Sequence, residues 1–434
     1  MRDEKAEIEI RNMEEITANS NNSIKFSPPD ISDLEIEYVS EALQSGWITT
    51  GYRTKKLEHM IEGWIGCSRA VCLNSATAAL EMALRILGIG LGDEVIVPAY
   101  TYTASASVIN HVGAKIILID CQADSFEMDY DAMEAAINEH TKAIISVDLG
   151  GIPCDYDRIY RAVKCKRKCF NPANKLQATL GRVAVVADSA HAFGAKIKYK
   201  DEWKMVGSRA DFTSFSFHAV KNFTTGEGGT LTWKKIAGVN SDMIYNQIQL
   251  YSLHGQSKDA FSKNNFGSWE YDIIGTWYKC NMTDIMAAIG IAQFERYPKM
   301  LARRREIIEM YDAAFKPMGI ETLDHFNAHH ESSGHLYITR IPRIADADRR
   351  QIIAEMADNG IATNVHYKPL PMMTAYKNMG FYINEYPNAF NHYINEITLP
   401  LYSLLTDEQV AYVIKKYREI CGKYLKKSLF SFGL

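Results

Sequence analysis

The sequence predicts an α/β fold in which a mainly parallel sheet lies between layers of helices. Apolar runs of four or five residues, the length of a strand covered on both faces, occur at 94–97, 115–119, 143–147 and 183–187. The intervals between them leave room for crossover helices, for example at 103–111 and 130–137. With 434 residues, 47% of them hydrophobic, the chain has enough material for a large buried core divided between two domains.

Changes in this pattern predict an N-terminal arm at 1–25, a large domain at 26–295 and a small domain at 296–434. The arm is polar and ends in a Ser/Asn cluster. In the large domain, a strand at 70–73 leads into a helix with one apolar face. The small domain begins with a long basic helix and continues with a strand, HLYITRI, and further helices, which is typical of an α+β unit.

The charge balance excludes several classes of partner. Lys and Arg total 48 against 52 Asp and Glu, so a net charge of -4 provides no general attraction for nucleic acid or for an anionic membrane. The apolar runs are far shorter than a membrane span, and the N-terminus MRDEKAEIEIRNMEE has no signal-peptide core. We therefore expect a cytoplasmic protein. Its eight cysteines show no metal-ligand spacing and are expected to be reduced thiols.

One lysine lies among neighbours that suit an unprotonated amine. Residues 214–229 read SFSFHAVKNFTTGEGG, which places Lys221 between a Ser/Phe/His cluster and a glycine-rich turn. Desolvation by apolar neighbours lowers the pKa of a lysine and makes its amine nucleophilic near neutral pH. The apolar neighbours here are Phe215, Phe217, Val220 and Phe223. This context alone also fits a surface lysine, so the interpretation depends on the rest of the chain.

Two further residues suit a ring with a basic nitrogen. Asp188 stands where a predicted buried strand ends, and open α/β sheets bind ligands at the carboxyl ends of their strands. A carboxylate there could hold a pyridine nitrogen protonated, which makes the ring an electron sink. His191 could reach the same ring or its phenolic oxygen. The structural alternatives are an Asp that caps the next segment and a buried, satisfied histidine.

A phosphate site is predicted where the strand at 70–73 meets its helix. In Asn74-Ser75-Ala76-Thr77, free N–H groups, the helix dipole and the hydroxyls of Ser75 and Thr77 converge. A simple helix N-cap is the alternative. Tyr102, in PAYTYTASA at another strand end, could stack on a flat ring or pack in the core. The amine, the carboxylate, the phosphate site and the aromatic ring together favour one shared site.

Eight motifs follow one another along the chain: GWITTG (46–51), NSATAALEMAL (74–84), PAYTYTAS (98–105), DSAHAFGA (188–195), SFHAVKN (216–222), GEGG (226–229), NMTDIMAAIG (281–290) and VHYKPL (365–370). From about Pro28 to the C-terminus the sequence resembles the DegT/DnrJ/EryC1/StrS sugar-nucleotide aminotransferases, which are fold type I pyridoxal-phosphate (PLP) enzymes. The resemblance implies a seven-stranded, mainly parallel sheet in a large PLP-binding domain, followed by a small C-terminal α+β domain.

The resemblance also implies roles for the predicted site residues. Lys221 would hold PLP as a Schiff base and move the proton during catalysis, with Asp188 and His191 as the other catalytic residues around the pyridine ring. Tyr102 would stack on the ring face. The implied cofactor-binding residues are Ala76, Thr77, Tyr102, Asp188, His191, Ser216, Lys221 and Lys279.

Lys279 marks a departure from the family pattern. The family often has an Asn shortly before the Met-Thr-Asp segment, and this Asn reaches the cofactor phosphate of a neighbouring subunit. Here the stretch at 277–284 reads WYKCNMTD, so Lys279 takes that place, and a cation could also serve a phosphate. An exposed lysine is the alternative. The resemblance implies a homodimer in which Lys279 or Asn281 acts in trans.

The implied reaction moves an amino group from L-glutamate or glutamine to a ketone on a nucleotide-linked sugar. The related sugar 3-dehydrases carry a histidine at the lysine position, so Lys221 favours transamination. The stretch from LHGQSKDAF to NMTD resembles the C4-acting branch, which implies a UDP- or GDP-linked 4-keto-6-deoxyhexose for surface polysaccharide or glycan biosynthesis, with a 3-keto sugar as the alternative. Candidate substrate-binding residues are Trp47, Ile48, Thr49, His254, Lys258, His366 and Tyr367.

Two interpretations from other classes remain open at this stage. A non-catalytic PLP-binding regulatory module would keep Lys221 and Asp188 but would need a DNA-binding segment, and no helix-turn-helix candidate is evident. The basic residues 164–168 could instead bind RNA or another anion. They belong to a segment at 164–177 that looks like an insertion and is expected to be a solvated loop.

Overall fold

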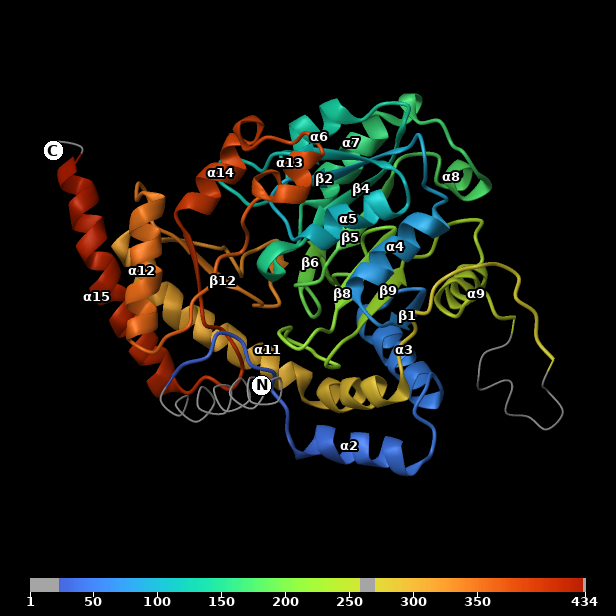
Figure 1. Ribbon diagram of the computed structural model, residues 1–434, viewed down its shortest axis with the longest axis horizontal. Coiled ribbons are helices and arrows are strands. Elements are labelled where there is room, and N and C mark those ends of the chain that lie inside the picture. The colour runs from blue at the N-terminus through green and yellow to red at the C-terminus, as the bar shows by residue number, and fades with distance from the viewer. Residues whose placement is uncertain (1–22, 258–269, 432–434) are drawn as a thin grey trace, which may run out of the picture.

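The computed structural model describes residues 23–257 and 270–431, and it confirms the predicted α/β fold (Figure 1). The central sheet has seven strands in the order β1-β9-β8-β5-β4-β2-β3. Strand β9 is antiparallel to β1 and β8, and the other neighbours are parallel. The strands are β1 (Arg69–Leu73), β2 (Glu94–Pro98), β3 (Lys115–Ile119), β4 (Thr141–Val147), β5 (Ala184–Asp188), β8 (Phe212–Ser216) and β9 (Gly229–Trp233).

Helices cover both faces of this sheet, which explains why its strands are apolar throughout. On one face, α4 (Ala76–Ile86), α5 (Thr103–His111) and α9 (Ser241–Ser252) pack over side chains that include Val95 and Val97. On the other face, α6 (Tyr130–Ala136) and α7 (Tyr156–Cys165) cover Ile96 and Ile144. Successive strand residues point to opposite faces, so a continuous apolar run fills both layers.

The C-terminal part has its own core around a second sheet. Strands β10 (Glu321–Thr322), β12 (Tyr337–Arg340) and β13 (Glu396–Leu399) form this antiparallel sheet, which packs against α12 (Asp346–Asp358) and α15 (Asp407–Ser431). Two short helices, α13 (Thr374–Asn378) and α14 (Pro387–Ile394), lie between α12 and β13 along the chain. The order of elements agrees with the predicted α+β character of this part.

One long helix belongs to both cores. Helix α11 (Asp284–Phe315) crosses the predicted domain boundary at 295/296. Its first half packs with α3 (Tyr52–Ile65) in a core that includes Ala287 and Ile291. Its second half carries Ile307 and Tyr311 into the C-terminal core. Helix α2 (Asp33–Gln44) lies beside the first half of α11 (Figure 1).

The segment at 164–177 differs from its prediction as a solvated loop. It contains the end of α7, a 3-10 turn at Arg167–Cys169 and the start of α8 (Lys175–Leu180). Gln177 is buried, and its side-chain amide and that of Asn174 both donate to the carbonyl oxygen of Leu87 at 2.8 Å. The segment therefore satisfies a carbonyl at the end of α4, which sequence periodicity could not indicate.

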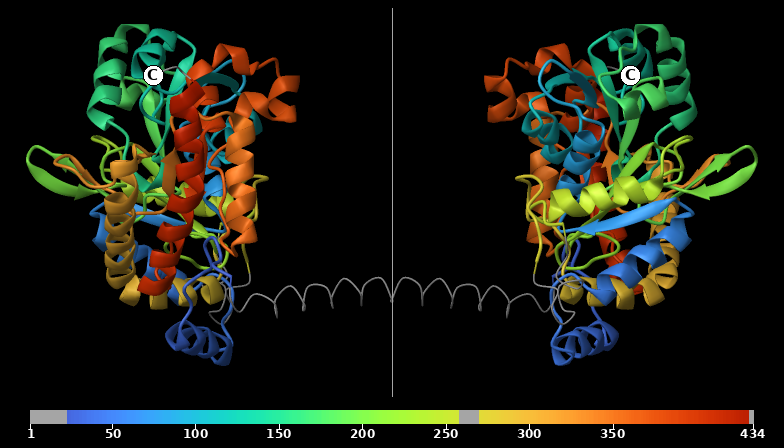
Figure 2. Two further views of the ribbon diagram at one scale, coloured as in Figure 1. Left: turned by 90° about the vertical axis from the view of Figure 1, so that its left-hand side faces the viewer. Right: turned by 90° about the vertical axis from the view of Figure 1, so that its right-hand side faces the viewer.

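A third sheet projects from the side of the molecule as a hairpin (Figure 2). It consists of β6 (Lys196–Tyr199) and β7 (Glu202–Met205), with the short β11 (His330–Glu331) beside β6. Within the described ranges, no helix has the length and apolar character needed to cross a bilayer. The cytoplasmic location stays a prediction.

Candidate active site

A cavity of about 350 Å³ opens at the carboxyl ends of the central strands, where α/β folds place their ligands. Loops that follow β2, β5 and β8 contribute to it, as do the end of β4, the start of α4 and two segments of the C-terminal part. The predicted residues among its lining are Ala76, Thr77, Tyr102, Asp188, His191, Ser216, Lys221, His366 and Tyr367. Residues far apart in the sequence thus meet in one pocket.

Lys221 lies in the loop between β8 and β9 and lines this cavity. Phe217 and Phe223 on either side of it are buried and pack against each other. Burial lowers the pKa of the Lys221 amine to about 8, although the nearby Asp188 carboxylate works in the opposite direction. About a tenth of this amine is therefore unprotonated at pH 7, far more than for an ordinary lysine, and is available as a nucleophile.

Asp188 ends the buried strand β5 and is itself buried. Its carboxylate accepts hydrogen bonds from the Ser105 hydroxyl at 2.6 Å and from the Ala190 N–H at 3.2 Å. Burial raises the pKa of Asp188, while these hydrogen bonds and Lys221 oppose the rise. Because Ser105 donates to Asp188, its oxygen accepts from the hydroxyl of Thr101, 2.8 Å away. The carboxylate is thus fixed in position beside the cavity.

His191 is held in one tautomer by its neighbours. The N–H of Gly150 donates to its Nδ1 at 3.2 Å, so a neutral ring carries its proton on Nε2. The hydroxyl of Tyr367 lies 3.0 Å from Nε2 and accepts that proton. Burial, followed by the charge of Lys221, holds the pKa of His191 well below its usual range. The imidazole is therefore a neutral donor at the site.

A second buried histidine, His335, was missed by sequence reasoning. It precedes β12 and lies beside His191, with 4.4 Å between the ring centroids. Its Nδ1 is 2.9 Å from Oδ1 of Asn222, whose amide group donates to the carbonyl oxygen of Ser333 at 2.7 Å. Asn222 directly follows Lys221, so this contact joins the lysine loop to the C-terminal part. The only sequence signal was a histidine immediately before the LYITRI strand.

The opposite end of the cavity is suited to an anion. Ser75 caps α4 by accepting from the N–H of Ala78 at 3.1 Å, while the N–H groups of Ala76 and Thr77 begin the helix without intrahelical partners. Ser216, at the end of β8, lines the same region. A helix N-terminus with exposed N–H groups attracts phosphate through both hydrogen bonding and the helix dipole.

Aromatic rings stand at the mouth of the cavity. The ring of Tyr102 is 59% exposed and lies 5.8 Å from that of Tyr367, centroid to centroid. His366 is next to Tyr367 and stacks on Phe26, with 5.5 Å between their centroids. An exposed tyrosine at this edge is free to stack on a bound flat ring.

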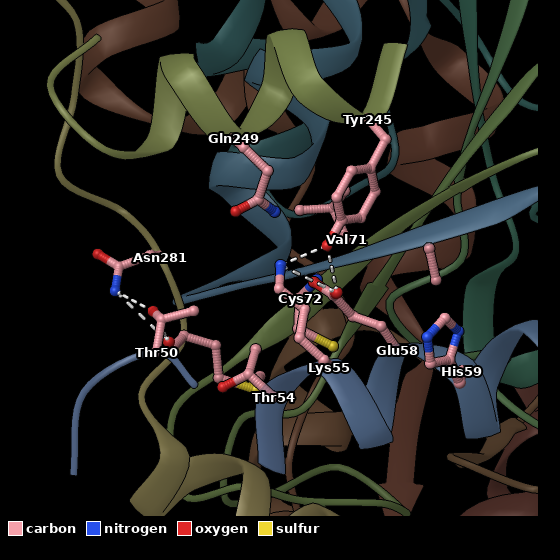
Figure 3. Close-up of polar contacts among 12 residues, drawn as sticks. Thr50, Thr54, Lys55, Glu58, His59, Val71, Cys72, Tyr245, Gln249 and Asn281 are labelled. Carbon is pink, nitrogen blue, oxygen red and sulfur yellow. Dashed lines mark hydrogen bonds and ion pairs between the residues drawn. The ribbon is translucent and has the colours of Figure 1, made fainter. Parts of the chain in front are cut away.

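Other predicted residues lie apart from this cavity within the single chain. Trp47 donates from its indole N–H to the carbonyl oxygen of Thr50 at 3.2 Å. Figure 3 shows Asn281, which donates to the hydroxyl of Thr50 at 2.5 Å. Lys279 is exposed and bonds to Asn281. Thr49 belongs to the same group, His254 is exposed near Tyr278, and Lys258 lies outside the described residues. The roles assigned to these residues stay predictions.

The cavity fits PLP in size and chemistry. A pocket of about 350 Å³ lies at the lower end of the range for small-ligand sites. It offers an amine for the aldehyde, a buried carboxylate for the ring nitrogen, and a helix N-terminus for the phosphate. Among the described residues of the lining, the only carboxylate besides Asp188 is that of Glu227, which is exposed and lies 3.6 Å from Nε2 of His218.

Known proteins that resemble this chain include a protein assigned as a sugar aminotransferase that binds PLP. The apo form of Spr1654 from Streptococcus pneumoniae, assigned as a sugar aminotransferase, is 53% identical, covers 94% of this chain and 99% of its own, and superimposes with a TM-score of 0.89. It is also known in PLP and PMP forms. The spore coat polysaccharide biosynthesis protein SpsC of Bacillus subtilis is 36% identical over 92% of this chain and 97% of its own.

A more distant structure has the same architecture. Helicobacter pylori PseC, an aminotransferase in the biosynthesis of pseudoaminic acid, is 26% identical with a TM-score of 0.78, and covers 92% of this chain and 99% of its own. The sheet order and the pocket at its edge are those of a fold type I aminotransferase. Residues 29–418 match the DegT/DnrJ/EryC1/StrS aminotransferase family, and the chain belongs to it.

Proposed function

We propose that the protein is a PLP-dependent aminotransferase that moves an amino group from L-glutamate or glutamine to a nucleotide-linked keto-deoxysugar. The observation that carries this proposal is the buried Lys221 amine, with its lowered pKa, in one cavity with Asp188 and the start of α4. Bound there, PLP supplies an electron sink and carries the amino group between the two substrates.

Each residue of the site would have a separate role in the reaction. Lys221 would hold the cofactor through its aldehyde carbon, and its free amine would move a proton between the substrate's α-carbon and the cofactor. Asp188 keeps a proton on the ring nitrogen, for which its fixed position beside Ser105 prepares it. His191 offers its Nε2–H to the ring's phenolic oxygen or to Tyr367. Ala76, Thr77 and Ser216 bind the phosphate.

The acceptor that we propose is a ketone on a nucleotide sugar, and the names of the relatives support a sugar as the substrate class. SpsC acts in spore coat polysaccharide biosynthesis, PseC in pseudoaminic acid biosynthesis, and Spr1654 is assigned to sugar amination. A lysine at position 221 supports transamination over dehydration. We place the ketone at C4 of a UDP- or GDP-linked 6-deoxyhexose, with C3 as the alternative, and the pathway in polysaccharide biosynthesis.

In a homodimer, the predicted site residues that lie outside the cavity of their own chain could reach the cavity of the second subunit. Trp47 and Asn281 bond to Thr50, Lys279 bonds to Asn281, and Thr49 precedes Thr50 in the chain. None of these four predicted residues lines the cavity of its own chain. We infer that they complete the pocket of a second copy. Exposed apolar side chains from α2 to the start of α3 include Ile36, Leu43, Ile48 and Tyr52.

The first test is the absorption spectrum of the purified protein. We expect an imine band that shifts when L-glutamate is added, and that is missing from a Lys221→Ala variant with an unchanged melting temperature. Lys235→Ala, which removes an exposed lysine, is the matched control and should keep both the band and the shift. Steady-state transamination by Lys221→Ala would contradict the proposal. The sugar is then identified with a panel of keto-sugar nucleotides, and the aminated carbon by NMR of the product.

A further inference from the structure

A buried carboxyl, a hydroxyl and an imidazole form a continuous hydrogen-bonded chain that ends at the cavity. Glu396 and Thr398 are fully buried in β13, and the Thr398 hydroxyl is 2.5 Å from Oε1 of Glu396. The same hydroxyl is 3.0 Å from Nδ1 of His366. Oε2 of Glu396 accepts from the backbone N–H of His366 at 3.0 Å. His366 lines the cavity.

The hydroxyl of Thr398 has one proton, so it can donate either to Glu396 or to His366 but not to both at once. When Glu396 is ionised, Thr398 must donate to it and accept from Nδ1–H of His366, which leaves a lone pair on Nε2. When Glu396 is protonated, it donates to Thr398, Thr398 donates to Nδ1, and the proton of His366 sits on Nε2. Among residues 23–257 and 270–431, no hydrogen-bond partner meets Nε2, so this atom faces the cavity.

We propose that Glu396, Thr398 and His366 form a proton relay in which the buried carboxyl decides whether His366 presents a donor or an acceptor to the cavity. A proton that arrives at Nε2 of His366 displaces the Nδ1 proton to Thr398, and the hydroxyl proton of Thr398 passes to Glu396. The reverse order returns one proton to the cavity. The imidazole is neutral in both end states, and Glu396 and Thr398 act as positioning residues.

The electrostatic surroundings agree with this arrangement. Burial lowers the pKa of His366 to about 3, so its ring stays neutral at physiological pH. Burial raises the pKa of Glu396 to about 8, against the effects of Thr398, the His366 N–H and Arg349. The other groups that face the relay are Lys221, His191, His335, Tyr367, Tyr100 and Tyr417. Burial lowers the pKa of both histidines and raises the pKa of all three tyrosines. Glu396 is therefore the member of the relay that titrates near neutral pH.

The consequence for substrate binding rests on the proposed function, although the relay itself does not. With a proton on Nε2, His366 binds an oxygen that only accepts hydrogen bonds, such as a carbonyl, phosphate or carboxylate oxygen. With a lone pair on Nε2, it requires a donor such as a sugar hydroxyl. The pocket therefore changes its preference at this position without gaining charge on the ring.

The decisive measurement is the tautomer of His366 in the holoenzyme, read from long-range ¹H–¹⁵N spectra of ¹⁵N-histidine-labelled protein between pH 6 and 9.5. His366→Gln identifies the signal. In the wild type we expect Nε2–H at low pH and Nδ1–H at high pH, with a midpoint near 8. A tautomer that does not change over this range would overturn the relay.

Near-isosteric variants locate the proton. In Glu396→Gln, the amide oxygen accepts from the His366 N–H and the NH₂ group donates to Thr398, which fixes Nε2–H at every pH. Thr398→Val breaks the chain and removes the transition, whereas Thr398→Ser keeps it. Thr232→Val is the control, because Thr232 is a buried hydroxyl in β9 that does not line the cavity. A transition that persists in Thr398→Val would also overturn the relay.

A kinetic readout separates the relay from the proposed function. The KM for the keto-sugar nucleotide should rise about fivefold from pH 7 to pH 9 in the wild type and in Thr398→Ser, the effect of one lost neutral hydrogen bond. The rise should be absent in Glu396→Gln. An equal rise in Glu396→Gln would contradict the role in substrate binding, whereas failure of amino transfer as such, with the tautomer change intact, would contradict only the proposed function.

Discussion

The hydroxyl of Tyr367 lies 3.0 Å from Nε2 of His191, and the N–H of Gly150 donates to the other nitrogen of the same ring. Because Gly150 fixes the tautomer, His191 is the donor and Tyr367 the acceptor in this pair. The tyrosine keeps its own hydroxyl proton for a group in the cavity. A residue of the C-terminal part thus completes the hydrogen bonding of a residue that follows the central sheet.

The first prediction concerns this pair. Tyr367→Phe removes a hydrogen bond at the cavity but no part of the predicted phosphate site, so we expect kcat/KM for the acceptor to fall about tenfold with little change in PLP affinity. Tyr376→Phe is the matched control, since Tyr376 is buried and bonds to Thr103 outside the cavity. A loss of PLP affinity in Tyr367→Phe, measured by fluorescence titration, would assign Tyr367 to cofactor binding instead.

A second prediction tests the carboxylate at the end of β5. Asp188→Asn cannot keep a proton on the ring nitrogen, so we expect kcat to fall at least about a hundredfold, within the range for a positioned acid or base. Ser105→Ala removes only the 2.6 Å hydrogen bond to Asp188 and should cost much less. Stopped-flow absorbance of each half-reaction measures both. Equal losses in the two variants would show that the hydroxyl, rather than the charge, limits the reaction.

A third prediction uses the close approach of β9 to α4. A Cβ at Gly229 would overlap the backbone nitrogen of Ala76 and lie 2.5 Å from the carbonyl carbon of Ser75. Gly229→Ala should therefore displace the start of α4 and weaken PLP binding at least about tenfold. Gly63→Ala, in α3 with open space around it, should leave the affinity unchanged and the fold as stable or slightly more so. Equilibrium dialysis of the apoprotein would decide between these outcomes.

A fourth prediction concerns pH and stability. Asp148 is buried, with the hydroxyls of Ser189 and Tyr156 and the N–H of Cys154 on its carboxylate, and burial raises its pKa from 3.8 to about 6. The folded protein therefore binds this proton more tightly than the unfolded chain. Protonated Asp148 contributes its full stabilisation below pH 3.8, its pKa in the unfolded chain, and this stabilisation is lost as the pH rises through about 6.

Asp148→Asn cannot take up that proton. From pH 7.5 to pH 5, the wild type should therefore gain about 1 to 2 kcal/mol of unfolding free energy relative to Asp148→Asn. Urea unfolding at both pH values measures the difference. If the difference in unfolding free energy between the two proteins stays constant, or grows toward high pH, the pKa of Asp148 is not raised in the folded state.

Much of the fold could be predicted because it rests on local patterns. Apolar runs placed β2, β3, β4 and β5 within two residues, and 103–111 coincides with α5. The three-residue or four-residue repeat placed the helix only from about residue 296, although α11 begins at Asp284 with a local cap, in which the Thr283 hydroxyl accepts from the N–H of Met286. The first turn of α11 also makes a distant contact that no periodicity encodes. The carboxylate of Asp284 accepts from the N–H groups of Gly51 and Thr54, and so caps α3.

The site was predictable where chemistry depends on residue type, and less so where it depends on packing. Lys221, Asp188 and the start of α4 follow from motifs at strand ends. His335 and Asn222 meet only because β12 packs beside the lysine loop, which no periodicity encodes. The relay through Glu396 was equally hidden, since a glutamate in a strand of a small domain gives no sign that a threonine two residues on joins it to the cavity.

The two-glycine turn at Gly150 and Gly151 has a consequence for attempts to change acceptor preference. Gly150 contacts His191 and, through its carbonyl oxygen, His335, while the carbonyl oxygen of Gly151 accepts from Ser333. A library that varies this turn would disturb both histidines at once and yield mostly inactive clones. Substitutions at the opening of the cavity, away from this turn, can change the shape of the opening while His191 and His335 keep their positions.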